Sequence, residues 1–147
     1  GSASVPFNTT IKGNGNFTAT GVWGPAGPAS ITLDSNYTGT ATLQGTNTLT
    51  GGIFLNGGTL VGTVAGAMGT SSNTVTFGGG GTAILDLKAA ATTYTALLNV
   101  AGASGTVYVE PASAGAGVTH VIGATTLGGG YTLTVKGGAL VNSGLPS

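Results

Sequence analysis

The chain has 147 residues, with three lysines, no arginine, three carboxylates and a formal net charge of zero. Charged residues make up 4% of it, against roughly 25% in typical soluble proteins, so it lacks the positive surface that nucleic acids and anionic membranes require. The absence of cysteine excludes disulfides, thiol nucleophiles and cysteine-ligated metal sites.

The composition nevertheless indicates a folded protein. The 30 glycines and 5 prolines approach the level of low-complexity chains, but Leu, Ile, Val and Phe number 34 and alternate with polar residues in short runs. No apolar run reaches the roughly 18 residues of a membrane helix. The opening GSASVP has neither the charged nor the apolar part of a signal peptide, which is typical of a mature form or a cloning scar.

Apolar and polar residues alternate with a period of two along most of the chain, which predicts strands with one buried face. Glycine or asparagine stands at nearly every junction and permits sharp turns. Residues 88–98 are predicted as strand and loop, because three β-branched threonines oppose the helix that an alanine triplet favours. The predicted strands are 17–20, 31–33, 40–43, 53–56, 59–61, 74–77, 83–87, 106–110, 118–122, 131–136 and 139–141.

The strands are short, and the glycine pairs at their ends are followed almost at once by another apolar residue. This pattern suits the corner of a coil, where the strand ends but the core continues, better than the hairpins of a β-sandwich, which is the alternative fold. At about 20 residues per coil, residues 1–147 are expected to form one all-β domain, a parallel β-solenoid of about seven coils, roughly 30 to 35 Å long.

Residues 46–62, TNTLTGGIFLNGGTLVG, and 65–87, AGAMGTSSNTVTFGGGGTAILDL, resemble the passenger-associated repeat of bacterial autotransporters, and residues 131–144 are partially similar to it. The resemblance implies a right-handed parallel β-helix that is secreted or displayed on a bacterial surface, either as an excised piece of a passenger or as a small stand-alone protein. Residues 1–45 do not match and are expected to form an N-terminal cap or a strand-exchange segment, whereas 46–87 are the best match.

The resemblance also implies roles for single residues within 46–87. The glycines would form corners, the aliphatic and aromatic residues would point inward, and Asn56 would lie at a turn. The implied corner glycines are Gly51, Gly52, Gly57 and Gly58, and the implied core residues are Leu49, Leu55, Leu60, Val75, Phe77, Leu85 and Leu87.

The sequence predicts no catalytic residue, cofactor or metal ligand. His120 is the only histidine, and it would need partners brought by the fold to act as a base or ligand. Asp34, Asp86 and Glu110 include the two carboxylates that a glycosidase would need, but only three lysines and no arginine are present to bind an acidic sugar. The glycine run 78–81 lacks the Lys-Ser/Thr pair of a phosphate-binding loop.

Other polar and aromatic positions have surface or capping roles. Trp23 is expected to plug the N-terminal end of the coil, in preference to stacking on a sugar. Asn8, Asn16 and Asn36 each begin an Asn-x-Thr triplet and are candidate acceptors of N-linked glycans.

A non-catalytic extracellular or cell-surface role follows, in which copies assemble into a fibre, filament or matrix by end-to-end stacking or strand exchange. An open solenoid end exposes unpaired N–H and C=O groups, and few charges guard it. An adhesive passenger fragment that binds surface glycans or host receptors is the alternative. Ice or sugar binding ranks lower, because Thr-x-Thr pairs such as Thr74 and Thr76 recur at irregular spacing.

Overall fold

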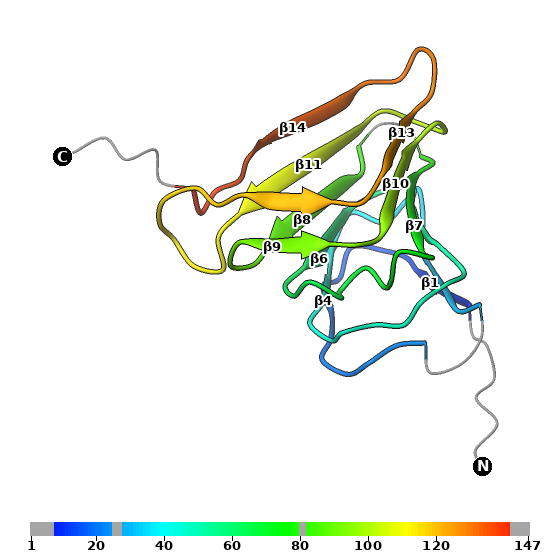
Figure 1. Ribbon diagram of the computed structural model, residues 1–147. Helices are drawn as coiled ribbons and strands as arrows, with labels where there is room; N and C mark the ends of the chain where they lie inside the picture. The colour runs from blue at the N-terminus through cyan, green and yellow to red at the C-terminus, as the bar shows by residue number, and fades with distance from the viewer. Residues whose placement is uncertain (1–7, 25–27, 80–81, 142–147) are drawn as a thin grey trace.

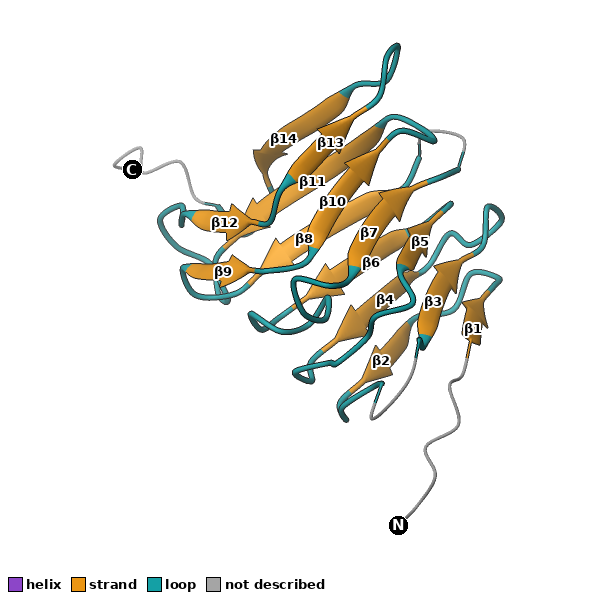
Figure 2. Ribbon diagram, turned by 45° about the vertical axis from the view of Figure 1, so that its right-hand side comes forward, coloured by secondary structure: helices purple, strands orange, loops and turns teal. Residues whose placement is uncertain are grey.

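The computed structural model describes residues 8–24, 28–79 and 82–141 and shows a parallel β-solenoid of about five turns (Figure 1). Within these ranges no helix forms and every strand pairs in parallel. The antiparallel hairpins of the alternative β-sandwich are therefore not the basis of this fold. The strands are stacked like rungs, with the two described chain ends at opposite ends of the stack (Figure 2).

Two six-stranded sheets form the main walls of the coil, and a two-stranded sheet adds a third wall near the C-terminal end. The first sheet consists of Asn8–Ile11 (β1), Ser30–Leu33 (β3), Ile53–Leu55 (β5), Thr74–Phe77 (β7), Leu97–Val100 (β10) and Thr125–Leu127 (β13), in that order. The second consists of Phe17–Ala19 (β2), Thr40–Leu43 (β4), Thr59–Gly62 (β6), Ile84–Lys88 (β8), Gly105–Glu110 (β11) and Leu133–Gly137 (β14), and the third of Thr92–Tyr94 (β9) and His120–Ile122 (β12).

Most coils are longer than the expected 20 residues, so the prediction of seven turns is wrong. Asn8 pairs with Ser30, 22 residues later, and the spacing rises to 28 residues between Thr106 and Thr134. The additional residues form excursions between strands, such as 63–73. These excursions lengthen the path around the coil without adding a layer to the stack, which leaves about five turns.

The strand at 139–141 is also predicted wrongly, because only Val141 forms an isolated bridge, to Gly115. The backbone turns back after β14, and the Leu140 N–H donates to the Glu110 carboxylate at 3.3 Å. Conversely, β1 and β13 form at positions where no strand was predicted. Residues 88–98 form strand and loop as predicted, with β9 inside that range and β10 beginning at its end.

The interior is a narrow aliphatic column that also holds two tyrosines. Tyr37 and Tyr94 are buried, and their hydroxyls donate to the carbonyls of Gly15 at 2.9 Å and Gly62 at 2.8 Å. These bonds remove the cost of an unpaired buried hydroxyl. All the residues implied to point inward are buried, namely Leu49, Leu55, Leu60, Val75, Phe77, Leu85 and Leu87.

Buried asparagines connect successive coils at the corners. Asn47 donates to the Ala67 carbonyl at 2.6 Å and accepts from the Trp23 N–H at 2.7 Å. Asn73 has the same role in the following coil, where it accepts from the Gly52 N–H at 2.8 Å. Each side chain therefore pairs backbone groups that the sheets leave unpaired at a corner.

The two members of each glycine pair have different tasks. The second member takes a positive φ, 96° at Gly52 and 63° at Gly58, which L-residues rarely adopt. The first member lies against the preceding coil, where an added Cβ would be 2.4 Å from a carbonyl oxygen at Gly51 and 2.7 Å from one at Gly57. Asn56 lies in the bend that leads into the second pair.

Candidate functional site

The last coil leaves inward-facing side chains uncovered. Among the described strands, β13 and β14 are the last of the two large sheets, and each has a neighbour on one side only. Leu127 is 56% exposed and Val135 60% exposed, although their partners one coil earlier, Val100 and Val107, are buried. This end of the stack therefore presents both unpaired backbone groups and apolar side chains.

The first coil is open in the same way, with β1 and β2 as the edge strands of the same two sheets. Ile11 and Phe17 are partly buried against the core. Trp23 packs beside Phe17, with ring centroids 5.6 Å apart, so it covers some of this end. Val22 next to it remains 61% exposed.

The strand register relates the two ends to each other. In the first sheet, the inward-facing row that begins at Ile11 ends at Leu127. In the second sheet, the row that begins at Phe17 ends at Val135. Both rows therefore begin and end with an apolar side chain.

A second feature lies on the outer face of the second sheet, where four of the six charged residues gather. The register places Asp86, Tyr108 and Lys136 in one row across β8, β11 and β14, and Lys88 beside Glu110 in the next row. Adjacent strands are about 4.8 Å apart, so these side chains are immediate neighbours. Together with Thr59 and residues 137–140 they line a pocket of about 640 Å³, here named the charged pocket.

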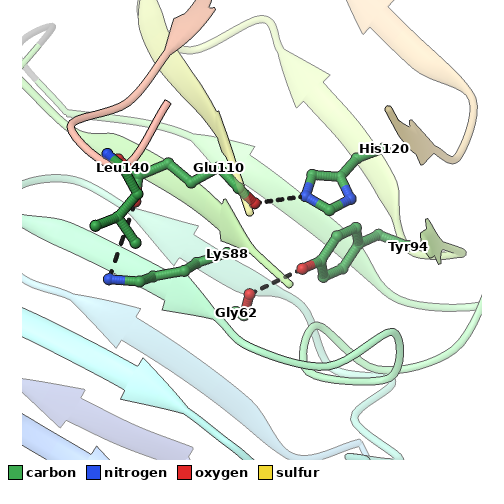
Figure 3. Close-up of polar contacts among 6 residues, drawn as sticks. All are labelled: Gly62, Lys88, Tyr94, Glu110, His120 and Leu140. Carbon is green, nitrogen blue, oxygen red and sulfur yellow. Dashed lines mark hydrogen bonds and ion pairs between the residues drawn. The ribbon is translucent and has the colours of Figure 1, made fainter. Parts of the chain in front are cut away.

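Glu110 fixes one wall of the charged pocket. It is buried, and its Oε2 lies 3.9 Å from Lys88 Nζ, while its Oε1 accepts the Leu140 N–H. Its backbone carbonyl accepts a hydrogen bond from His120 Nε2 at 2.9 Å (Figure 3). Because a carbonyl can only accept, the Nε2 atom carries a proton. The ring of His120 also meets Tyr94 edge-on, at 5.4 Å between centroids.

Asp86 is the carboxylate of the charged pocket that has no ion pair. The ion pairs of the described residues join Lys12 to Asp34 and Lys88 to Glu110. Burial, and after it the charge of the neighbouring Glu110, raise the pKa of Asp86 to about 6 against the opposing effect of Lys88. Its Oδ1 is buried and accepts no hydrogen bond from any described residue. The site thus holds a carboxylate with unused hydrogen-bonding capacity.

Tyr108 separates Asp86 from Lys136 in their row. The Lys136 ammonium lies 5.0 Å from the centroid of the Tyr108 ring, within the range of a cation–π contact. Lys136 has no carboxylate partner within the stretches of chain that the structure describes. The row therefore runs from an unpaired carboxylate, across an aromatic ring, to an unpaired ammonium group.

We expect the Asp86→Asn variant to be less sensitive to pH than the natural protein. Folding raises the pKa of Asp86 from 3.8 to about 6, so the folded state holds this proton more tightly. The resulting stabilisation is complete below the unfolded pKa and is lost as the pH rises through about 6. Since the Asp86 side chain is only half-buried and partly screened by water, we expect this pH-dependent stabilisation to be about 1 kcal/mol.

Urea denaturation of both proteins at pH 4 and pH 7.5 measures this difference. The free energy of unfolding of the natural protein should fall by about 1 kcal/mol more than that of Asp86→Asn between the two pH values. Parallel pH profiles would show that Asp86 titrates as an ordinary surface carboxylate.

The third carboxylate lies apart from this pair. Asp34 forms an ion pair with Lys12 at 3.6 Å and accepts the Asn36 N–H at 3.0 Å. The hydrogen bond from Asn36, followed by the charge of Lys12, lowers the pKa of Asp34. The structure therefore brings together Asp86 and Glu110 but not Asp34.

The candidate glycan acceptors Asn8, Asn16 and Asn36 are all exposed. The side-chain oxygen of Asn8 accepts from the Ser30 hydroxyl at 2.8 Å, and that of Asn16 accepts from the Thr40 N–H at 3.0 Å. In the glycine run 78–81, residues 80 and 81 lie outside the described ranges.

Threonines do stack in register on the outer faces, despite their irregular spacing in the sequence. Unequal coil lengths bring Thr40 beside Thr59, and Thr106 beside Thr134. Within the described strands, however, no row holds more than two threonines in succession, because residues such as Ile84 interrupt them. A continuous flat threonine face is therefore not formed by these strands.

The charged pocket was not predicted from the sequence, although the spacing of its residues indicates it. Asp86 and Tyr108 are 22 residues apart, and so are Lys88 and Glu110. That spacing equals the commonest coil length in the first sheet. Charged residues separated by one coil length are neighbours in a solenoid, whatever their distance along the chain.

The chain matches no family model, and no curated protein or solved structure is significantly similar to it. In the described ranges, no helix is long and apolar enough to cross a membrane. The same ranges contain no cluster of three or more His, Asp or Glu side chains placed to hold a metal ion. The proposals below therefore rest on the fold, on the open ends of the stack and on the charged pocket.

Proposed function

We propose that the protein is a non-catalytic, extracellular or surface-displayed building block that assembles head to tail into a fibre. The observation that supports this proposal is that, within the described ranges, both large sheets end at both ends of the stack on strands with one free edge. Such edges are templates for parallel pairing with another chain.

A second copy stacked on the last coil would extend both sheets at once. Its β1 would pair with β13 and its β2 with β14, in the parallel sense of all the other pairs. Leu127 would then meet Ile11, and Val135 would meet Phe17, so apolar side chains exposed at the two ends would become buried. The contact joins two different surfaces and does not close on itself, which produces a filament.

Neither terminal lysine opposes this arrangement. The outer row that ends at Lys136 begins at Thr18, so a stacked copy would place a threonine beside Lys136. Lys12, at the other end, is already paired with Asp34. Lysines on edge strands normally block association by repulsion or desolvation, but here they do not face each other.

A lysine scan of β14 tests the proposal. Val135→Lys places a charge in the row that would continue into the next copy, whereas Thr134→Lys places the same charge on the outer face of the same strand. We expect the natural protein and Thr134→Lys to form filaments in electron microscopy and sedimentation velocity. Val135→Lys should remain monomeric, because stacking would bury its charge. Monomers for all three proteins, or filaments for all three, would contradict stacking through this face.

An adhesive autotransporter passenger segment is the second candidate function. Residues 46–87, which carry the resemblance to the passenger-associated repeat, contain β5 to β7 and all of β8 except its last residue. The open strands that accept a second copy accept further coils of a longer passenger equally well. A natural protein that stays monomeric at high concentration would favour this function over the fibre.

A further inference from the structure

We propose that the charged pocket binds a neutral, hexose-containing saccharide on the side of the solenoid. The outer strand rows elsewhere carry mainly threonine and apolar residues, yet four of the six charged side chains of the chain meet here. The inference does not rest on the proposed assembly, although Lys136 and residues 137–140 belong to the last coil, where a stacked copy would place Thr18 beside Lys136.

An ion-pair network alone does not account for this cluster. Only Lys88 and Glu110 approach within ion-pair distance there, at 3.9 Å. Asp86 and Lys136 stay apart on either side of Tyr108, and the Asp86 Oδ1 is buried without a hydrogen bond from any described residue. The buried Oδ1 is closed to a ligand as it is to water, so a ligand would meet the part of this half-buried side chain that remains exposed.

A saccharide matches the groups that this row presents. Its hydroxyls donate to a carboxylate and accept from an ammonium group, so one ligand satisfies both Asp86 and Lys136. The half-buried ring of Tyr108, one face of which meets the Lys136 ammonium, adds apolar surface for the C–H groups of a pyranose. The volume of about 640 Å³ lies within the roughly 300–1,000 Å³ typical of small-molecule sites.

The balance of charge favours a neutral ligand. Two carboxylates and two ammonium groups line the charged pocket, so an acidic sugar would face Asp86 and Glu110, and a cationic ligand would face Lys88 and Lys136. Like charges in a partly desolvated site cost affinity. A ligand without net charge meets neither repulsion.

The wall beside the site is fixed before any ligand arrives. Leu140 is tied to the Glu110 carboxylate through its N–H, and an added Cβ at Gly138 would overlap the same carboxylate. A preformed wall reduces the ordering cost of binding. Gly138 therefore allows residues 138–140 to close over Glu110 and complete the pocket.

Calorimetric titration with uncharged gluco-, galacto- and manno-oligosaccharides tests the proposal, with an oligogalacturonate as the acidic probe. We expect the natural protein to bind at least one neutral oligosaccharide more tightly than the acidic probe. Asp86→Val and Tyr108→Ala should each weaken that binding at least tenfold. The matched control Thr106→Val, on β11 outside the charged pocket, should bind as the natural protein does.

The variants are chosen so that loss of binding is not confused with loss of folding. Val61 occupies the row of Asp86 one coil earlier, so Asp86→Val suits the fold, and its urea midpoint should equal or exceed that of the natural protein. Asp86→Asn keeps the shape of the side chain and should also bind more weakly. Val135→Lys should bind normally, which separates this site from assembly. No neutral binding by the natural protein, tighter binding of the oligogalacturonate, or undiminished binding by Asp86→Asn and Asp86→Val would overturn the proposal.

Discussion

The Phe77→Ala variant is expected to lose about 3–5 kcal/mol of stability, because truncation of a fully buried aromatic side chain removes its transfer free energy and leaves a cavity. Phe77 is fully buried on β7. Its ring lies against Gly105 of the opposite sheet, where an added Cβ would be 2.4 Å from the ring. The missing side chain of Gly105 therefore makes the space that the ring fills, and alanine cannot fill it.

Phe54 provides the matched control, since it lies on the adjacent strand β5 but faces outward and is 40% exposed. Phe54→Ala should cost less, about 1–2 kcal/mol, because part of its ring stays in water and its loss leaves no enclosed cavity. Urea denaturation of both variants measures the difference. If Phe77→Ala has no soluble folded state, Phe77→Leu should still show a loss of about 1 kcal/mol. Equal losses at positions 54 and 77 would mean that the inward and outward faces are assigned wrongly.

The second large effect is expected at Gly58. Alanine there would take a φ of 63°, at a cost of roughly 1–2 kcal/mol, and its Cβ would lie 2.5 Å from the Tyr37 ring. Overpacking of a core side chain costs a further 1–3 kcal/mol or so. We therefore expect Gly58→Ala to lose about 3 kcal/mol in total.

Gly130 separates these two contributions. It has a φ of 84°, and an added Cβ would meet nothing within 4 Å. Gly130→Ala should therefore show the backbone cost alone, about 1–2 kcal/mol. Thermal or urea unfolding of the two variants should differ by about 2 kcal/mol. A Gly58→Ala variant as stable as Gly130→Ala would mean that the corner relaxes without pressing on Tyr37.

The parallel solenoid could be predicted because its cause is local. Alternating segments such as 74–77 and 83–87 specify which side chains face inward, and the glycine pairs at 51–52 and 57–58 specify corners. In the structure the inward-facing side chains of these segments are buried, and Gly52 and Gly58, the second glycines of the two pairs, have positive φ. The inward-facing positions and the corners depend on residues that are close in the sequence, so a local pattern is enough to predict them.

The number of turns, the last strands and the charged pocket depend on contacts between distant residues. β13 has exposed side chains throughout and forms because β10 provides a partner in register, which no local pattern reveals. Residues 139–141 have strand-like composition, but Glu110 and Gly115 pair with Leu140 and divert the backbone. Asp86 and Lys136 are neighbours of Tyr108 only once the length of each coil is known.

The strands lie across the direction of stacking, and β1 and β14, which hold the first and the last strand residues, stand at opposite ends of the stack (Figure 2). Tension applied along the stack, between β1 and β14, would break the interstrand hydrogen bonds of one coil before those of the next. Because each coil contacts mainly its neighbours, the chain would unfold and lengthen one coil at a time. A fibre of these units would yield gradually under pulling and dissipate work before any junction ruptures.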